Sequence, residues 1–115
     1  MKKYDIVIVN LNPTSGSEQQ GVRPCLVLQN NIANSSKLQT VTIAPFTSNI
    51  KLYPASIIVE PSAENKLKSP SRLELSQIRT IDKHRILMES GVLDEKYRHQ
   101  VQEKLIDFFD VDDLW

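Results

Sequence analysis

The sequence contains few of the residues that build metal sites and disulfides. Its 115 residues include one cysteine, Cys25, and two histidines, His84 and His99. A structural zinc site needs four thiolate or imidazole ligands at short spacings, and a lone cysteine has no internal partner for a disulfide. We therefore expect no metal site, and the lack of disulfides agrees with a reducing cytosol.

Glycine is also scarce, and neither sign of charge dominates. Gly16 and Gly21 fit neither a P-loop nor a dinucleotide-binding pattern, so no nucleotide cofactor is expected. Lys and Arg number 14, as do Asp and Glu, so no overall field attracts the protein to nucleic acid or to an anionic membrane. Any contact with phosphate must therefore be local.

Long apolar runs are missing as well. The run Ile6–Val9 follows two lysines but stops at Asn10, which is far short of a signal sequence or a membrane span. We therefore expect no membrane association and a cytoplasmic location.

The order of elements predicts a mainly β domain that ends in one helix. Short runs rich in β-branched residues, bounded by Asn, Pro and Ser, predict strands at 5–11, 23–29, 38–46, 55–59, 73–78 and, more weakly, 86–89. Such spacing favours a barrel or a sandwich. After Asp94 as N-cap, apolar residues recur on one helical face, which should pack on the barrel: Tyr97, Val101, Leu105, Phe108 and Phe109. No repeat or linker interrupts residues 1–115, so a single domain is expected.

Arg23 is the strongest candidate for chemistry that the residues alone provide. It follows a long polar loop over residues 12–22, and a connection of that length is often functional. Pro24 pushes Arg23 into an extended conformation, so the guanidinium is held at a strand entrance. Its planar donors can grip two phosphate oxygens, although a surface salt bridge is the simpler alternative.

Cys25, His84 and His99 each have a structural and a functional interpretation. Cys25 stands in an apolar run, which favours a buried core residue over a catalytic thiol. His84 and His99 stand among charged residues, which favours solvated side chains over a general base.

Three segments together resemble the MazF/PemK toxins. The first is residues 12–24, which contains Gly-x-Glu-Gln followed by Arg-Pro; the second is Pro45–Ser48, and the third is Ser76–Asp82. Their order and spacing agree with the family, and the likeness extends over nearly the whole chain. The resemblance implies an SH3-like barrel with a C-terminal helix, the CcdB/PemK-like plasmid maintenance toxin fold.

The resemblance also implies a function and partners. It implies the toxin of a type II toxin-antitoxin system, a metal-independent endoribonuclease (mRNA interferase) that cuts single-stranded RNA at short sequences. The 2′-hydroxyl of the RNA would attack, leaving a 2′,3′-cyclic phosphate and a 5′-hydroxyl. The implied partners are a second copy in a homodimer and a cognate MazE-like antitoxin.

The family's functional residues fall on specific positions of this chain. The resemblance places the catalytic roles on Arg23 and Thr47. It places RNA binding on Ser17, Glu18, Gln19, Ser48 and Gln77. One branch of the family carries a histidine where Ser17 stands, so its acid-base assignments do not transfer, and the general base stays open between Glu18, Glu74 and neither.

Two other functions remain as alternatives. A CcdB-like protein of the same fold would bind and poison DNA gyrase without catalysis, using C-terminal helix residues that include a terminal tryptophan, and this chain ends in Trp115. The second alternative is a barrel-type interaction module in which Arg23 only makes salt bridges. The first-loop motif and Arg23 favour the nuclease.

Overall fold

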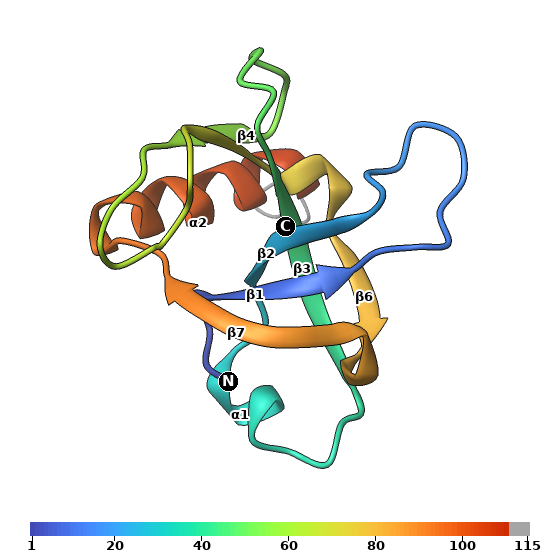
Figure 1. The fold of residues 1–115 in the computed structure, drawn as a ribbon. Helices are drawn as coiled ribbons and strands as arrows, with labels where there is room; N and C mark the ends of the chain where they lie inside the picture. The colour runs from blue at the N-terminus through green and yellow to red at the C-terminus, as the bar shows by residue number, and fades with distance from the viewer. Residues whose placement is uncertain (111–115) are drawn as a thin grey trace.

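The structure, a computed structural model, describes residues 1–110 and contains strands, two helices and two short 3-10 turns (Figure 1). The strands are β1 (Asp5–Asn10), β2 (Val22–Val27), β3 (Thr40–Thr47), β4 (Ser56–Val59), β5 (Ser71–Glu74), β6 (Arg79–Asp82) and β7 (Ile86–Val92). The helices are α1 (Asn31–Asn34) and α2 (Glu95–Phe109), and the 3-10 turns are Leu75–Gln77 and Lys83–Arg85.

The strands form one antiparallel sheet that bends into a barrel. Its order is β4-β5-β3-β2-β1-β7, and β6 pairs with β3 outside that path. The long strand β3 connects the two halves, since its first residues pair with β6, its middle with β2, and its last two residues with β5. The predicted mainly β fold with a C-terminal helix is confirmed.

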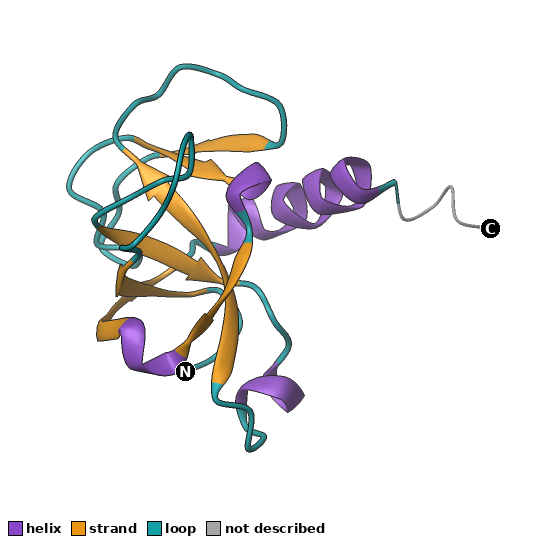
Figure 2. Cartoon of the chain, turned by 90° about the vertical axis from the view of Figure 1, so that its right-hand side faces the viewer, coloured by secondary structure: helices purple, strands orange, loops and turns teal. Residues whose placement is uncertain are grey.

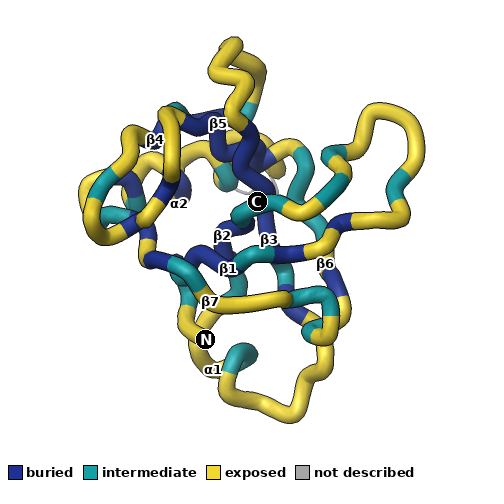
Figure 3. The backbone as a smooth tube through the Cα atoms, in the orientation of Figure 1, coloured by how far each residue is buried: buried dark blue, intermediate teal, exposed yellow. Residues whose placement is uncertain are grey.

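Two apolar cores lie on opposite sides of the central strands. Side chains alternate along a strand, so Ile6 and Leu26 enter one core while Val7 and Cys25 enter the other. The larger core continues to Phe46 and to helix α2. Figure 3 shows the central strands as buried and the loops that leave them as mostly exposed. The central strands therefore form a rigid support for these loops.

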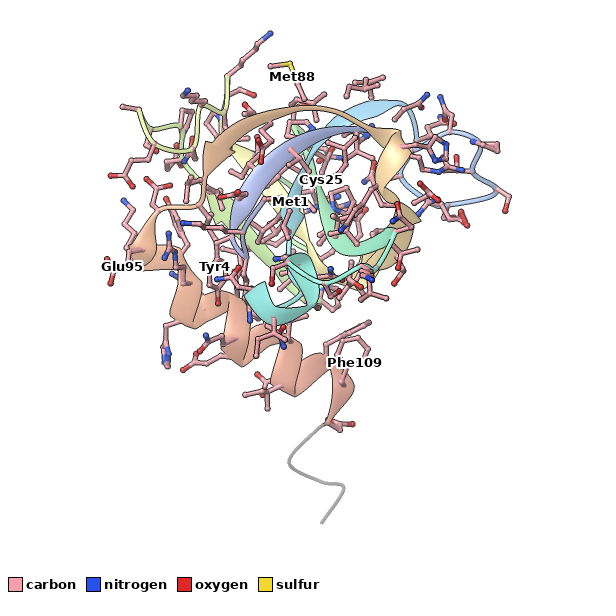
Figure 4. The ribbon with its side chains drawn as sticks, turned by 90° about the horizontal axis from the view of Figure 1, so that it is seen from below. Met1, Tyr4, Cys25, Met88, Glu95 and Phe109 are labelled. Atoms are coloured by element: carbon pink, nitrogen blue, oxygen red, sulfur yellow. The ribbon has the colours of Figure 1, made fainter. Side chains whose placement is uncertain are left out.

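Helix α2 contacts the barrel only along part of its length. Tyr97 and Val101 are buried and Leu105 packs against the same core, but Phe108 is 44% and Phe109 51% exposed. The expectation that the whole apolar stripe packs on the barrel is therefore wrong for its end. The reason is geometric, because the far end of α2 extends past the barrel (Figures 2 and 4).

Several local features differ from the predicted elements: strand β6 was not predicted, and β7 continues to Val92, beyond the predicted 86–89. The predicted strand at 73–78 ends at Glu74, where a 3-10 turn redirects the chain into β6, and Ile78 donates its N–H to the Leu75 carbonyl at 3.3 Å. The short helix α1 lies between the predicted strands at 23–29 and 38–46, where the Asn30 side chain accepts a hydrogen bond from the Ala33 N–H at 2.9 Å and caps it. Within residues 1–110, neither helix is long and apolar enough to cross a membrane.

Candidate functional site

Arg23 and Thr47 line the same cavity, although they are 24 positions apart in the sequence. The pairing of β2 with β3 ends at Cys25 and Pro45, and Arg23 and Thr47 each lie two residues beyond that last pair. The cavity has a volume of about 350 Å³, and Ser48 also lines it. Strand pairing thus brings the two predicted catalytic residues together with one of the predicted RNA-binding residues.

The Arg23 guanidinium is held by one nitrogen. Its Nε donates a hydrogen bond to the Gln20 carbonyl at 2.8 Å. Among residues 1–110, no hydrogen bond or ion pair engages its two Nη amino groups. The surface salt bridge that the sequence left open is therefore not formed in this part of the chain. Both amino groups remain available for an anion.

Two lysines that the sequence analysis did not single out line the same cavity. Lys66 and Lys68 are exposed and stand on either side of Leu67, which is buried in the larger core. The only sign of them in the sequence was the alternation of two lysines with one apolar residue, Leu67. With Arg23 they gather three cations around one cavity, so a protein without net charge has a local site suited to phosphate.

Thr47 presents its hydroxyl at the end of β3. The residue is 7% exposed, and its Oγ1 accepts a hydrogen bond from the Asn49 N–H at 3.3 Å. A hydroxyl that accepts in this way keeps its own hydrogen for donation. Thr47 can therefore donate to an oxygen placed in the cavity.

The loop between β1 and β2 is closed by its own hydrogen bonds. The Asn12 side chain accepts from the Gly21 N–H at 3.1 Å, and Leu11 donates to the Gly21 carbonyl at 2.9 Å. Gly21 has φ of 82°, a conformation that favours glycine. In Figure 1 this loop projects from the barrel, yet its two ends are tied together.

The remaining predicted RNA-binding residues line two other hollows. Glu18, Gln19 and Gln77 line a hollow of about 630 Å³, and Ser17, Gln19 and Gln77 line one of about 510 Å³. Gln19 and Gln77 belong to both, and the Gln19 N–H donates to the Gln77 side chain at 3.3 Å. The predicted residues thus fall into two groups, with Arg23, Thr47 and Ser48 in a separate cavity.

A buried ion pair on β5 was missed by the sequence analysis. Arg72 is 3% and Glu74 6% exposed, and an Arg72 amino group contacts one carboxylate oxygen of Glu74. The other carboxylate oxygen accepts from the side-chain amide of Gln19. Each carboxylate oxygen of Glu74 therefore has a partner inside the protein.

Cys25 and the two histidines have structural roles or are solvated. Cys25 is fully buried, and desolvation raises the pKa of its thiol to about 12 against the opposing effect of Arg23 and Arg79. This confirms the core interpretation. The side chains of His84 and His99 are each 79% exposed. Residues 1–110 contain no group of three or more His, Cys, Asp or Glu that could hold a metal ion.

Comparisons with known proteins agree on one family. Residues 2–109 match the family described as the PemK-like, MazF-like toxin of type II toxin-antitoxin systems. The endoribonuclease EndoA of Bacillus subtilis (strain 168) is 38% identical over 106 residues, covering 91% of this chain and 90% of its own length.

Solved structures have the same fold. MazF (Form-I) of Deinococcus radiodurans superimposes with a TM-score of 0.80 at 24% identity and covers 96% of both chains. The MazE-MazF structure (Form-II) of the same organism gives a TM-score of 0.71 at 21% identity, covering 95% of this chain and 94% of that one. At these identities the likeness shows the fold alone.

Proposed function

Because the chain belongs to the PemK-like, MazF-like family of toxins of type II toxin-antitoxin systems, we propose that it cuts single-stranded RNA as a sequence-specific endoribonuclease. The observation that carries the proposal is the shared cavity of Arg23 and Thr47, in which the amino groups of Arg23 are available. The substrate would be messenger RNA, and its cleavage would arrest growth.

The reaction we propose uses the 2′-hydroxyl of the RNA as the nucleophile. Attack on the adjacent phosphorus is intramolecular, so it needs neither a protein nucleophile nor a metal-bound water. The 2′-oxygen bonds to phosphorus, the 5′-oxygen leaves with a proton, and the products are a 2′,3′-cyclic phosphate and a 5′-hydroxyl. Negative charge develops on the non-bridging oxygens as phosphorus becomes five-coordinate.

Arg23 and Thr47 would stabilise that charge. The two Nη groups of Arg23 suit a bidentate grip on the non-bridging oxygens, and the Thr47 hydroxyl suits a third hydrogen bond. Lys66 and Lys68, which line the same cavity, would attract the flanking phosphates. Loss of one preorganised donor of this kind costs a factor of ~10²–10³ in rate.

Neither glutamate considered as a general base lines the cavity of Arg23 and Thr47. Glu18 lines a different hollow, where its carboxylate accepts from the Ser15 N–H at 3.4 Å. Glu74 is occupied on both oxygens. The proposal therefore assigns removal of the 2′-hydroxyl proton to neither residue.

Base recognition would use the polar side chains of the loops. The proposed contacts come from Ser17, Glu18, Gln19, Ser48 and Gln77, which line the three hollows. Splayed bases of single-stranded RNA expose hydrogen-bonding edges that amides and hydroxyls can read.

The proposal includes the setting in which the toxin works. We place residues 1–115 in the cytoplasm as one domain that acts as a homodimer. A MazE-like antitoxin would hold it inactive, and the MazE-MazF structure of Deinococcus radiodurans contains a pair of this kind. The CcdB-like alternative has lost support, because EndoA is named as an endoribonuclease. Trp115, on which that alternative drew, lies outside the described residues.

A digest of a long unstructured RNA in EDTA tests the proposal. The protein should cut it at a short sequence and leave cyclic phosphate ends, and Arg23→Ala should lower the rate at least ~10²-fold. Lys37→Ala, which removes an exposed cation elsewhere, is the matched control and should leave the rate unchanged. Equal cleavage by Arg23→Ala and the wild type would refute the assignment.

A further inference from the structure

Arg72 and Glu74 form a charged pair on β5, a strand whose four residues are all buried. Arg72 also donates to the Lys51 carbonyl, and its guanidinium lies over the Tyr53 ring at 4.5 Å from the centroid. Two buried charges cost free energy unless their partners are well placed, and both amino groups of Arg72 have a partner while its Nε has none among the described residues. We call this pair the anchor in the barrel wall.

The Arg72–Glu74 pair contacts the β1–β2 loop through the side chain of Gln19. The carboxylate oxygen of Glu74 that does not face Arg72 accepts a hydrogen bond from the Gln19 amide. The backbone N–H of Gln19 is held as well, by the Gln77 side chain at 3.3 Å. Gln19 is therefore fixed at both its side chain and its backbone, whereas Ser17 and Glu18 beside it are exposed.

The fixed point in the loop is one residue from the group that holds Arg23. The Gln20 carbonyl accepts the Nε–H of Arg23 at 2.8 Å and so sets the plane of the guanidinium. The Gln20 carbonyl belongs to the next peptide unit, so a shift of Gln19 reaches it through the backbone of Gln20 alone. The continuous path runs from Arg72 through Glu74, Gln19 and Gln20 to Arg23.

We propose that Arg72 and Glu74 are positioning residues of the nuclease, an inference that rests on the proposed function. They hold the β1–β2 loop through Gln19, and the loop in turn orients the Arg23 guanidinium toward the cavity of Thr47. The side-chain amide of Gln19, named above among the proposed RNA contacts, would then act inside the protein, on Glu74, and base contacts would fall to the other four residues. A displacement of about 1 Å at a reacting centre can cost ~10²-fold in rate, so the anchor acts mainly on kcat.

A pair of reciprocal substitutions tests the contact. Gln19→Glu sets a second carboxylate against that of Glu74, so the loop should be repelled from its anchor. Adding Glu74→Gln restores a donor and an acceptor in reversed order, because the new amide can donate to the new carboxylate while its oxygen accepts from Arg72. The double variant keeps the added loop charge, so repulsion of RNA by that charge is the same in both.

We expect kcat to fall in the single variant and to recover in the double variant. Gln19→Glu should lower kcat ~10- to 100-fold with KM for RNA within about threefold of wild type, and the double variant should return kcat to within about threefold. If Gln19 acted by reading a base, Glu74→Gln would recover nothing, and that result would overturn the proposal. Gln20→Glu adds the same charge one residue further along the loop. Any decrease in kcat that it causes should not be recovered by Glu74→Gln.

A second measurement does not depend on activity. Proton exchange of the Arg23 Nε–H, followed by NMR, should be slow in the wild type, faster in Gln19→Glu and slow again in the double variant. Unchanged exchange in folded Gln19→Glu would overturn the positioning role, whatever the kinetics. Failure of the proposed function is recognised separately, as an RNA digest in which wild type and Arg23→Ala behave alike.

Discussion

The buried Arg72–Glu74 pair predicts that breaking the pair destabilises the protein more than removing it. Their side chains are 4% and 8% exposed, so either partner left alone keeps a charge that water cannot reach. We expect Arg72→Leu or Glu74→Leu alone to lower the free energy of unfolding by ~3–5 kcal/mol. For a chain of this size roughly 4 °C is lost per kcal/mol, so the melting temperature should fall by about 12–20 °C.

The double variant, Arg72→Leu with Glu74→Leu, should lie close to the wild type. It removes both charges from the barrel wall, and replacing a buried pair by apolar side chains is often neutral or stabilising. The contacts of Arg72 with the Lys51 carbonyl and the Tyr53 ring are lost as well, so we expect a net change within about 2 kcal/mol of zero.

Urea unfolding followed by circular dichroism at one fixed protein concentration measures these differences, because self-association would otherwise shift the midpoint. A matched control is Lys37→Leu, an exposed charge whose loss should change stability by less than about 0.5 kcal/mol. The reasoning is refuted if either single variant loses less than about 1 kcal/mol, or if the double variant loses the sum of the two.

Three other outcomes follow from the structure. Thr47→Val should lower the cleavage rate by ~10²–10³-fold while Thr47→Ser keeps most of it, which a gel-based RNA assay decides. A Cβ on Gly91 would lie 2.4 Å from the Asn65 carbonyl oxygen, so Gly91→Ala should cost about 1–3 kcal/mol in urea unfolding, and an unchanged midpoint would contradict the close approach. Burial raises the pKa of the Cys25 thiol from 9.0 in the unfolded chain to about 12 in the folded protein, so the folded state retains its proton between these values and stability falls as pH rises through them. From pH 8 to 10 the wild type should lose about 1.4 kcal/mol more than Cys25→Ala, and equal losses would show that the thiol is not buried.

The sequence could indicate that Arg23 and Thr47 lie near each other, because each stands at the end of a recognisable strand; their catalytic roles stay a prediction. Arg23 is fixed by Pro24, and Thr47 ends a recognisable strand, so their meeting needed only the pairing of β2 with β3. Their motifs also carried the family resemblance.

The anchor and the lysines were not predicted because they depend on contacts between distant segments. A charged residue in a strand normally predicts an exposed face, and nothing in the order of residues says that both faces of β5 are covered. The meeting of Glu74 with Gln19 joins residues 55 positions apart, and no periodicity encodes it. The exposed end of α2 was mispredicted because periodicity identifies an apolar face but not where its support ends.

The tie between the β5 carboxylate and the β1–β2 loop has a consequence for chimeras. Grafting that loop from another toxin onto this scaffold, to change which RNA is cut, would bring a new residue opposite Glu74. The graft should then cut poorly, even with the intended recognition loop, until positions 72 and 74 are taken from the donor too. A redesign of RNA specificity would therefore have to change positions 19, 72 and 74 together.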